Sequence, residues 1–213
     1  MIHVEWKVEK EVEEYKMVDI KTSGVLSVID FAGTHNTIVN AIRRTILDDV
    51  PTMAIEDVEV VVNTSPIYDE IVAHRLGLVP LTTDFKSYNF KNDCKCGGIG
   101  CALCEVKMSL AAETPGYVLA ESIKSDDPKV IPADLKLPIT KLFGEKKIEL
   151  NMKAVLGTGR EHAKWAPAHT YLRENKKGVE LVIEPFGQLS AKEVYNKAID
   201  VLVEKIADLE ASF

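Results

Sequence analysis

The fold is decided near the start of the chain, where residues 36–56 read NTIVNAIRRTILDDVPTMAIE. Apolar side chains recur there three or four positions apart, which places them on one face of a helix. Arg43 and Arg44 lie off that face, and Pro51 disfavours helical backbone in the residue before it. The stretch therefore predicts an amphipathic helix that ends before Pro51. Its largest apolar positions are Ile38, Ile42 and Ile46.

A second amphipathic pattern occupies the far end of the sequence. Residues 179–186, VELVIEPF, have the apolar and β-branched composition of a strand, which Pro185 and Gly187 end. A long helix is predicted from Ala191 to about Leu209, because apolar residues then recur near heptad spacing. The apolar positions of this helix are Val194, Ala198, Val201, Leu202, Ile206 and Leu209.

Side chains that can cap a helix mark where three helices are expected to begin. Thr34 or Asn36 can accept a hydrogen bond from the first turn of the helix that follows them. Ser65 can do the same for a short helix further along the chain. Ser190 and Glu193 have the spacing of a capping box, in which each side chain bonds the backbone of the other residue.

Strand-like segments fill most of the remaining sequence, from VEWKV at residues 4–8 to KKIELNMKAVLG at residues 146–157. Because strands and a helix at each end bracket a β-rich middle, the chain is expected to be α+β with two domains. Residues 1–50 and 169–213 are expected to form a discontinuous dimerisation domain, a sheet with two long helices. A mostly-β domain, residues 51–168, is inserted in it. So thin a terminal domain would gain stability from a partner chain over its helices.

The composition excludes several classes of protein. The 213 residues include 46% hydrophobic and 28% charged residues, which suits a folded globular chain and not a disordered one. The formal net charge of −7 argues against a sequence-independent grip on nucleic-acid backbone, which needs clustered Lys and Arg. No apolar run approaches the roughly 18 residues of a membrane helix, and the first twenty residues lack a signal-peptide core. A cytoplasmic protein that meets DNA only indirectly is expected.

The strongest local signal is the segment CKCGGIGCALC at residues 94–104. Its C-x-C-x4-C-x2-C spacing lets four thiolates surround one Zn²⁺ ion tetrahedrally, and three glycines allow the backbone to fold around it. A closed shell of four sulfurs leaves no open position, so such a site is structural. Two short disulfides, free thiols or an iron–sulfur centre are the alternatives. The predicted ligands are Cys94, Cys96, Cys101 and Cys104.

No catalytic constellation emerges from the rest of the sequence. The segment GTGREHAKWAP at residues 157–167 lacks the spacing of a phosphate-binding loop. It is expected to bind another protein, since Trp and Arg are common interface anchors. A zinc-dependent hydrolase using His162, His169 and a cysteine pair is an alternative, and a zinc-ribbon module that binds nucleic acid is another. The expected contact residues of this segment are Arg160, His162, Lys164 and Trp165.

Four ordered motifs resemble one known family. They are the stretch at residues 36–56, NTSPIYDEIVAHRLGLVPL at residues 63–81, GTGREHAKWAP at residues 157–167 and VELVIEPFGQLSAKE at residues 179–193. Together they resemble the D subunits of archaeal DNA-directed RNA polymerase, the counterparts of the third-largest eukaryotic polymerase subunit and of the bacterial alpha amino-terminal domain. The resemblance covers nearly the whole chain.

The resemblance implies a non-catalytic assembly subunit. Family members pair with the small L subunit, and the pair, joined by the small N and P subunits, forms the platform for the two large catalytic subunits. Phosphoryl transfer and its Mg²⁺ belong to those large subunits, toward which Arg43 and Arg44 are implied to look. The helices at residues 36–49 and 191–209 are implied to face L. The residues expected at that face are Ile38, Ile42, Ile46, Val194, Val201, Leu202 and Ile206.

The resemblance also bears on metal content. The cysteine cluster is similar to the zinc loop of the eukaryotic relative, C-x-C-x3-C-x2-C, with one additional spacer residue. Many archaeal members carry an iron–sulfur domain shortly before the last strand. Only residues 168–178 separate the last two motifs here, and they contain no cysteine. The resemblance therefore implies zinc at the cluster and a short form without the iron–sulfur domain.

Overall fold

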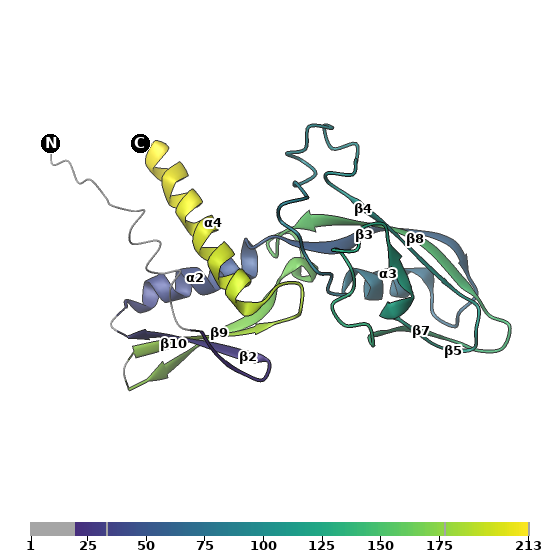
Figure 1. Ribbon diagram of the computed structural model, residues 1–213, viewed down its shortest axis with the longest axis horizontal. Helices are drawn as coiled ribbons and strands as arrows, with labels where there is room; N and C mark the ends of the chain where they lie inside the picture. The colour runs from purple at the N-terminus through teal and green to yellow at the C-terminus, as the bar shows by residue number, and fades with distance from the viewer. Residues whose placement is uncertain (1–19, 33, 177, 213) are drawn as a thin grey trace. The chain divides into compact units, whose positions relative to one another are not determined.

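The computed structural model describes residues 20–212 apart from residues 33 and 177, and Figure 1 shows its path. The described residues form three α-helices, two four-stranded sheets and a two-stranded sheet. This confirms the expected mixture of helices and sheets. None of the described helices is long and apolar enough to cross a membrane. The strand predicted at residues 4–8 lies outside the described part of the chain.

Contacts along the chain divide it into two compact units. The first unit holds the described residues up to 50 and residues 167–185, and it continues from residue 190 onward. The second unit holds residues 51–166 together with the short connection at residues 186–189. Each unit has its own sheet and its own buried side chains.

The first unit is built on an antiparallel sheet with the strand order β1-β2-β10-β9. Segments from the two ends of the chain meet at its centre, where Leu181 lies opposite Ile29 and both side chains are buried. Gly24, with a φ of 63°, makes the turn between the first two strands. The sequence does not predict β9, because its polar composition weakens the strand pattern. The strands are β1 Ile20–Ser23, β2 Leu26–Ala32, β9 Ala168–Asn175 and β10 Gly178–Pro185.

Helices α2 (Asn36–Asp48) and α4 (Ala191–Ala211) pack over this sheet and against each other (Figure 1). An ion pair of 2.5 Å between Lys205 and Asp49 joins α4 to the residue that follows α2. Both helices therefore lie where the sequence predicts them. The side chains that they bury include Val39, Ile42 and Ile46 of α2 and Val194, Tyr195 and Ala198 of α4.

The two helices of the first unit begin in different ways. At the start of α4, Ser190 and Glu193 form the predicted capping box, and Ser190 N donates to the Glu193 carboxylate at 2.8 Å. These bonds lower the pKa of Glu193. Helix α2 begins after His35, whose side chain makes no capping bond to the helix. The predicted cap at Thr34 or Asn36 is therefore wrong.

The second unit packs two sheets around a core of its own. The four-stranded sheet has the order β3-β8-β4-β6, and the small sheet pairs β5 with β7. Buried side chains of both sheets, such as Leu110, Ile139 and Leu150, meet in this core. The strands are β3 Thr52–Asn63, β4 Val106–Ala112, β5 Gly116–Leu119, β6 Ile123–Ser125, β7 Pro138–Leu142 and β8 Ile148–Gly157, and two 3₁₀ turns are η1 Ala120–Ser122 and η2 Ala163–Trp165.

Helix α3 (Asp69–Gly77) packs on the second unit through Val72 and Leu76. It begins after Tyr68, so the predicted cap at Ser65 is wrong. Ser65 instead donates its backbone N–H to Asn63 Oδ1 at 3.0 Å, in a turn that precedes the helix. The local turn around Asn63 has taken the position that the capping pattern would give to the first helical residues.

Candidate metal centre

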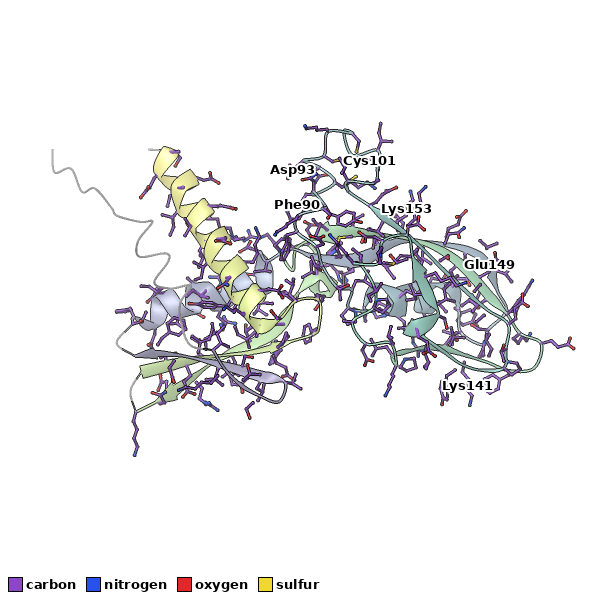
Figure 2. The ribbon with its side chains drawn as sticks, viewed as in Figure 1. Phe90, Asp93, Cys101, Lys141, Glu149 and Lys153 are labelled. Carbon is purple, nitrogen blue, oxygen red and sulfur yellow. The ribbon has the colours of Figure 1, made fainter. Side chains whose placement is uncertain are left out.

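The cysteine loop, residues 94–104, precedes β4 in the second unit, and Figure 2 labels Cys101 within it. Three glycines adopt backbone conformations that other residues avoid, with φ of 68° at Gly97, 82° at Gly98 and 106° at Gly100. These conformations turn the short loop back on itself. The thiols of four cysteines are thereby brought to one place.

The four cysteine sulfurs surround a common point. All four Sγ atoms lie within 4.8 Å of one another. The Sγ–Sγ distance is 3.6 Å from Cys94 to Cys101, 3.7 Å from Cys96 to Cys104 and 3.8 Å from Cys101 to Cys104. Sulfurs at the corners of a tetrahedron, each about 2.3 Å from a central Zn²⁺, lie about 3.8 Å apart. The cluster therefore has the size needed to hold a metal ion.

The same distances bear on the disulfide alternative. A disulfide joins two sulfurs about 2.05 Å apart, far closer than any of these pairs. All four cysteines are free thiols in the structure. Cys94 and Cys104 are buried, whereas Cys96 and Cys101 are half-buried. The loop thus presents four separate sulfur donors, two of them screened from solvent.

Burial and hydrogen bonding act in opposite directions on the thiols. Burial raises the pKa of Cys104 to about 12, so this thiol keeps its proton at neutral pH when no cation is near. The backbone N–H of Gly100 bonds the sulfur of Cys96 and, with the neighbouring Cys94, lowers the pKa of Cys96 to about 6. Metal ions bind the thiolate form, and binding to this cluster would release the remaining protons.

Polar contacts fix the base of the cysteine loop. The hydroxyl of Tyr88 donates to Asp127 Oδ2 at 2.5 Å, and Asn89 N donates to the carbonyl of Leu103 at 2.8 Å. Burial, with a smaller contribution from Asp127, raises the pKa of Tyr88. The same hydrogen bond lowers the pKa of Asp127. The loop is therefore tied to the segment that follows β6.

A close approach inside the loop explains the need for glycine at position 100. A Cβ added to Gly100 would overlap the carboxylate of Glu105. That side chain is only 8% exposed and forms a loose ion pair with Lys153, at 3.7 Å. Gly100 therefore meets two requirements, a positive φ and the absence of a side chain, and neither can be read from the cysteine spacing alone.

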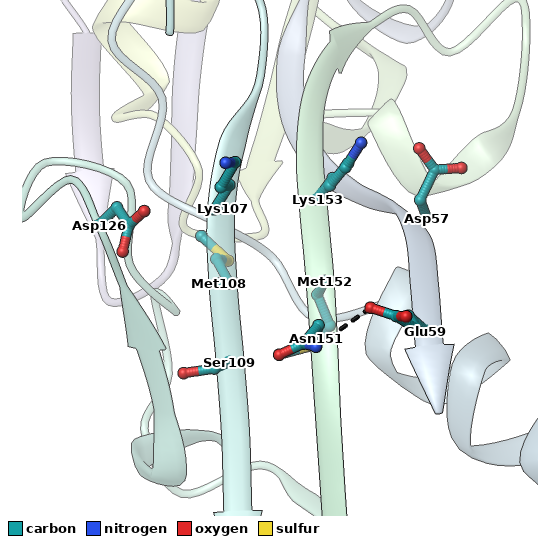
Figure 3. Close-up of a pocket in the computed structure, with 9 residues that line it drawn as sticks. All are labelled: Asp57, Glu59, Lys107, Met108, Ser109, Asp126, Asn151, Met152 and Lys153. Carbon is teal, nitrogen blue, oxygen red and sulfur yellow. Dashed lines mark hydrogen bonds between the residues drawn. The ribbon is translucent and has the colours of Figure 1, made fainter. Parts of the chain in front are cut away.

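A depression of about 400 Å³ lies on the outer face of the four-stranded sheet (Figure 3). One cross-strand row places Lys153 between Asp57 and Lys107. In the next row the side-chain amide of Asn151 donates to Glu59 at 3.1 Å. Charged and amide side chains in cross-strand register are typical of a solvated sheet face. We interpret the depression in this way, and not as a catalytic pocket.

Residues 57–170, more than half of the chain, match the family described as the RNA polymerase Rpb3/RpoA insert domain. The chain belongs to this Rpb3/RpoA family. The matched range includes the cysteine loop and most of the second unit. The resemblance to the archaeal D subunits concerns the same polypeptide under a different name.

Archaeal relatives of the chain are named DNA-directed RNA polymerase subunit Rpo3. The relative from Methanosarcina mazei is 42% identical over 156 residues, which are 73% of the chain and 57% of that relative. The one from Methanosarcina acetivorans is 36% identical over 221 residues, covering 94% of the chain and 81% of the relative. For Thermoplasma volcanium the identity is 38% over 187 residues, 78% of the chain and 67% of the relative.

One segment of this Rpb3/RpoA chain, residues 157–167, folds inward. Trp165 is 5% exposed, and its ring occupies the space above Gly157, where an added Cβ would overlap it. Lys164 Nζ donates to a backbone carbonyl of β3 at 3.0 Å, pairs with Glu56 and lies 4.4 Å from the centre of the Trp165 ring. The expectation that Lys164 and Trp165 are offered to a partner is corrected, because both side chains are used inside the second unit.

The histidines of the Rpb3/RpoA chain are not gathered into a metal site. His162 Nδ1 accepts the backbone N–H of Lys164 at 3.0 Å, and the ring of His169 lies 6.1 Å from that of Tyr171. Among the residues that the structure describes, the four cysteines form the only group of His, Cys, Asp and Glu side chains able to hold a metal ion. The alternative of a zinc hydrolase therefore has no support.

The residues expected to face a partner fall into two sets. Ile42, Ile46 and Val194 are buried in the first unit of the chain itself, which corrects their assignment to an open surface. Their apolar pattern is satisfied by their own sheet. The accessible set, which is exposed or half-buried, contains Ile38, Val201, Leu202 and Ile206, and the exposed Leu209 extends it.

The remaining predicted contact residues are polar and lie at the surface. Arg44, Arg160 and His162 are exposed. Arg43 is half-buried, and its Nε donates to Asn40 Oδ1 on the preceding turn of α2 at 3.0 Å. The sequence correctly places these side chains outside the buried core, and no binding partner is needed to explain their positions.

Proposed function

We propose that the chain is a non-catalytic assembly subunit of a DNA-dependent RNA polymerase. The observation that carries this proposal is the match of residues 57–170 to the Rpb3/RpoA insert domain, supported by relatives named polymerase subunit Rpo3. Its work is to hold other subunits, while phosphoryl transfer belongs to the large ones. It meets DNA only through the complex, in keeping with its net charge of −7, and acts in the cytoplasm.

The second half of α4 is our candidate for the face toward the small L subunit. In the first half of this helix, one apolar face is buried as far as Ala198. Steps of three and four residues continue that face to Leu202, Ile206 and Leu209. There Ile206 is 50% and Leu209 is 59% exposed. An apolar face that its own unit covers over only half of its length is suited to a second polypeptide. Ile38 of α2 and Val201 would extend the contact.

Polar surface residues are the candidates for contact with the two large subunits. Arg43 and Arg44 lie on α2 in the first unit, and Arg160 and His162 lie in the second. Arg is favoured at protein interfaces because its planar group combines apolar contact with several hydrogen bonds. The small N and P subunits would join the resulting pair.

We assign a structural Zn²⁺ ion to Cys94, Cys96, Cys101 and Cys104. The sulfur spacing fits a tetrahedral ion, and four thiolates leave no coordination position for a substrate. Two of the ligands are buried at the base of the loop. An ion held there would fix a loop that otherwise consists of turns, and it would supply stability without any catalytic role.

Co-expression with the L subunit of the same organism tests the proposed pairing. The two chains should elute as a 1:1 complex whose mass is measured by light scattering. Ile206→Asp should abolish the complex, because an unpaired carboxylate in the interface is costly. Ala207→Asp is the matched control. It adds the same charge to the same turn of α4, about 100° around the helix, and should leave the complex intact.

Two results would contradict the assembly role. The first is a folded wild-type chain that stays monomeric beside L at micromolar concentration. The second is salt-sensitive DNA binding by the isolated chain, which would favour the zinc-ribbon alternative over an assembly subunit.

A further inference from the structure

Helix α3 of the second unit has apolar side chains on two opposite faces. Its inner face packs Val72 and Leu76 into the core. On the outer side, Tyr68, which directly precedes the helix, is 81% exposed, Ile71 is 46% exposed and Leu78, which directly follows it, is 49% exposed. A helix of a soluble protein ordinarily presents a polar face to water. The outer side of α3 therefore has the composition of a buried surface.

The exposed side chains form one continuous strip. Ile71 and Leu78 are separated by two helical turns, so they project from the same face of α3. Tyr68 lies three residues before Ile71, at the start of that face. Large exposed side chains that gather on one strip, rather than being scattered, mark an interaction site. We call this strip, formed by Tyr68, Ile71 and Leu78, the outer face of α3.

A groove of about 360 Å³ runs beside this strip. Ala73 and Leu78 line it from the α3 side, and Ile55 and Val58 line it from β3. Leu78 belongs both to the groove and to the outer face of α3. The two features therefore make one surface, with a ridge and an adjacent hollow that could receive an apolar side chain.

The charges around this surface favour a basic partner. The cationic groups are already engaged, because Lys164 binds Glu56 and Arg75 Nη1 donates to a carbonyl of β7 at 2.9 Å. Asp57 lines the groove, and Glu70 lies on α3 beside Ile71. Among the described residues, neither carboxylate has a hydrogen bond or an ion pair. Carboxylates left over after the lysine and arginine have been used complement Lys or Arg on a second protein.

We propose that the outer face of α3 and the groove beside it bind an apolar segment, carrying Lys or Arg, of a polymerase subunit other than L. This inference rests on the proposed function. The surface belongs to the second unit, whereas the proposed face toward L belongs to α4 of the first unit. The chain would then hold two different subunits through two separate units.

The test is stepwise reconstitution with purified polymerase subunits of the same organism. The chain is first paired with L, and the pair is then titrated with each remaining subunit, with affinity measured by interferometry. Ile71→Asp and Leu78→Asp should each weaken the binding of one remaining subunit about ten-fold or more, as truncated interface anchors do. Tyr117→Asp is the matched control, because Tyr117 is equally open to solvent, at 68%, but lies on β5.

The outcomes separate this surface from the assembly role. Wild-type affinity of both α3 variants for every remaining subunit would overturn the proposed surface while leaving the pairing with L intact. Failure of the wild-type chain to pair with L would instead overturn the assembly role. Thermal melting checks that the variants fold. If Ile71→Asp melts early, Ile71→Ser removes the apolar side chain without adding a charge, and its unchanged affinity would equally refute the surface.

Discussion

The cysteine loop, residues 94–104, and the segment at residues 157–167 both lie in the second unit and use their glycines in opposite ways. In the cysteine loop, glycines with positive φ shape the backbone, so four thiols turn toward one another. In the other segment, Gly157 leaves a space that the ring of Trp165 fills. One segment thus builds a site from its own residues, and the other uses its large side chain for packing.

The difference shows how far each segment depends on the rest of the chain. The cysteine cluster needs only the backbone geometry of eleven consecutive residues. The burial of Trp165 depends on distant strands: Thr52 of β3 donates its hydroxyl to the Trp165 carbonyl at 2.7 Å, and the indole N–H donates to the Val155 carbonyl of β8 at 3.3 Å. Damage to the first should therefore stay local, whereas damage to the second should destabilise the whole unit.

Loss of the four thiols is expected to have the largest effect. Replacing all four cysteines by serine should reduce bound zinc from one ion per chain to none, because structural zinc is held by roughly 10–16 kcal/mol in small domains. Emission spectroscopy of the purified chain measures the metal content. Ile99→Ser, at an exposed position of the same loop, is the control and should keep the ion. Zinc retained by the quadruple variant would show that other residues bind it.

Truncation of the buried indole is expected to have the next largest effect. Trp165→Ala should lower the free energy of unfolding by about 3–5 kcal/mol, because it leaves a cavity and removes the hydrogen bond to β8. Urea denaturation followed by circular dichroism gives the value. Tyr117→Ala removes a similar area from an exposed site and should cost well under 1 kcal/mol. Equal losses in the two variants would mean that Trp165 is not a core residue.

A methyl group at position 157 probes the same contact from the opposite side. Gly157→Ala should cost about 1–3 kcal/mol, because the new Cβ displaces the Trp165 ring. The cost should shrink when Trp165 is first replaced by Leu, and a double-mutant cycle in urea measures that coupling. Strictly additive losses would argue against direct overlap between the two side chains.

The smallest expected effect concerns the base of the cysteine loop. Tyr88→Phe should cost about 1 kcal/mol at pH 7, because it removes the hydrogen bond to Asp127. That bond lowers the pKa of Asp127 below its ordinary value of 3.8, so its stabilisation is complete above pH 3.8 and is lost as the pH falls through the lower folded pKa. The difference between the two chains in urea should therefore vanish on acidification. A difference that persists unchanged at low pH would contradict this.

Features set by neighbouring residues could be predicted from the sequence. The capping box at Ser190, the amphipathic helices and the gathering of four cysteines each depend on residues within a few turns of one another. These local signals, with the mixed composition of strands and helices, led to the correct structural class. The family likeness, read from motifs, added the polymerase role that no spacing argument could supply.

Features set by distant contacts could not be predicted. Trp165 looks like an exposed anchor in the sequence, but its carbonyl and ring are held by residues 113 and 10 positions away. Ile42 and Ile46 have the periodicity of an interface, yet the same periodicity equally suits packing on their own sheet. The pattern indicates that a face is apolar, and only the tertiary fold shows what covers it.

The pairing of β2 with β10 has a consequence for the order of folding. Residues 51–166 are continuous and can close their core as soon as they leave the ribosome, whereas the first unit has to wait for β10 and α4. During that interval β2 lacks a neighbouring strand and α2 lacks the helix that packs on it. The nascent chain thus passes through a stage with one finished unit and one half-built, aggregation-prone sheet. Protection by a chaperone would matter most at that stage of synthesis.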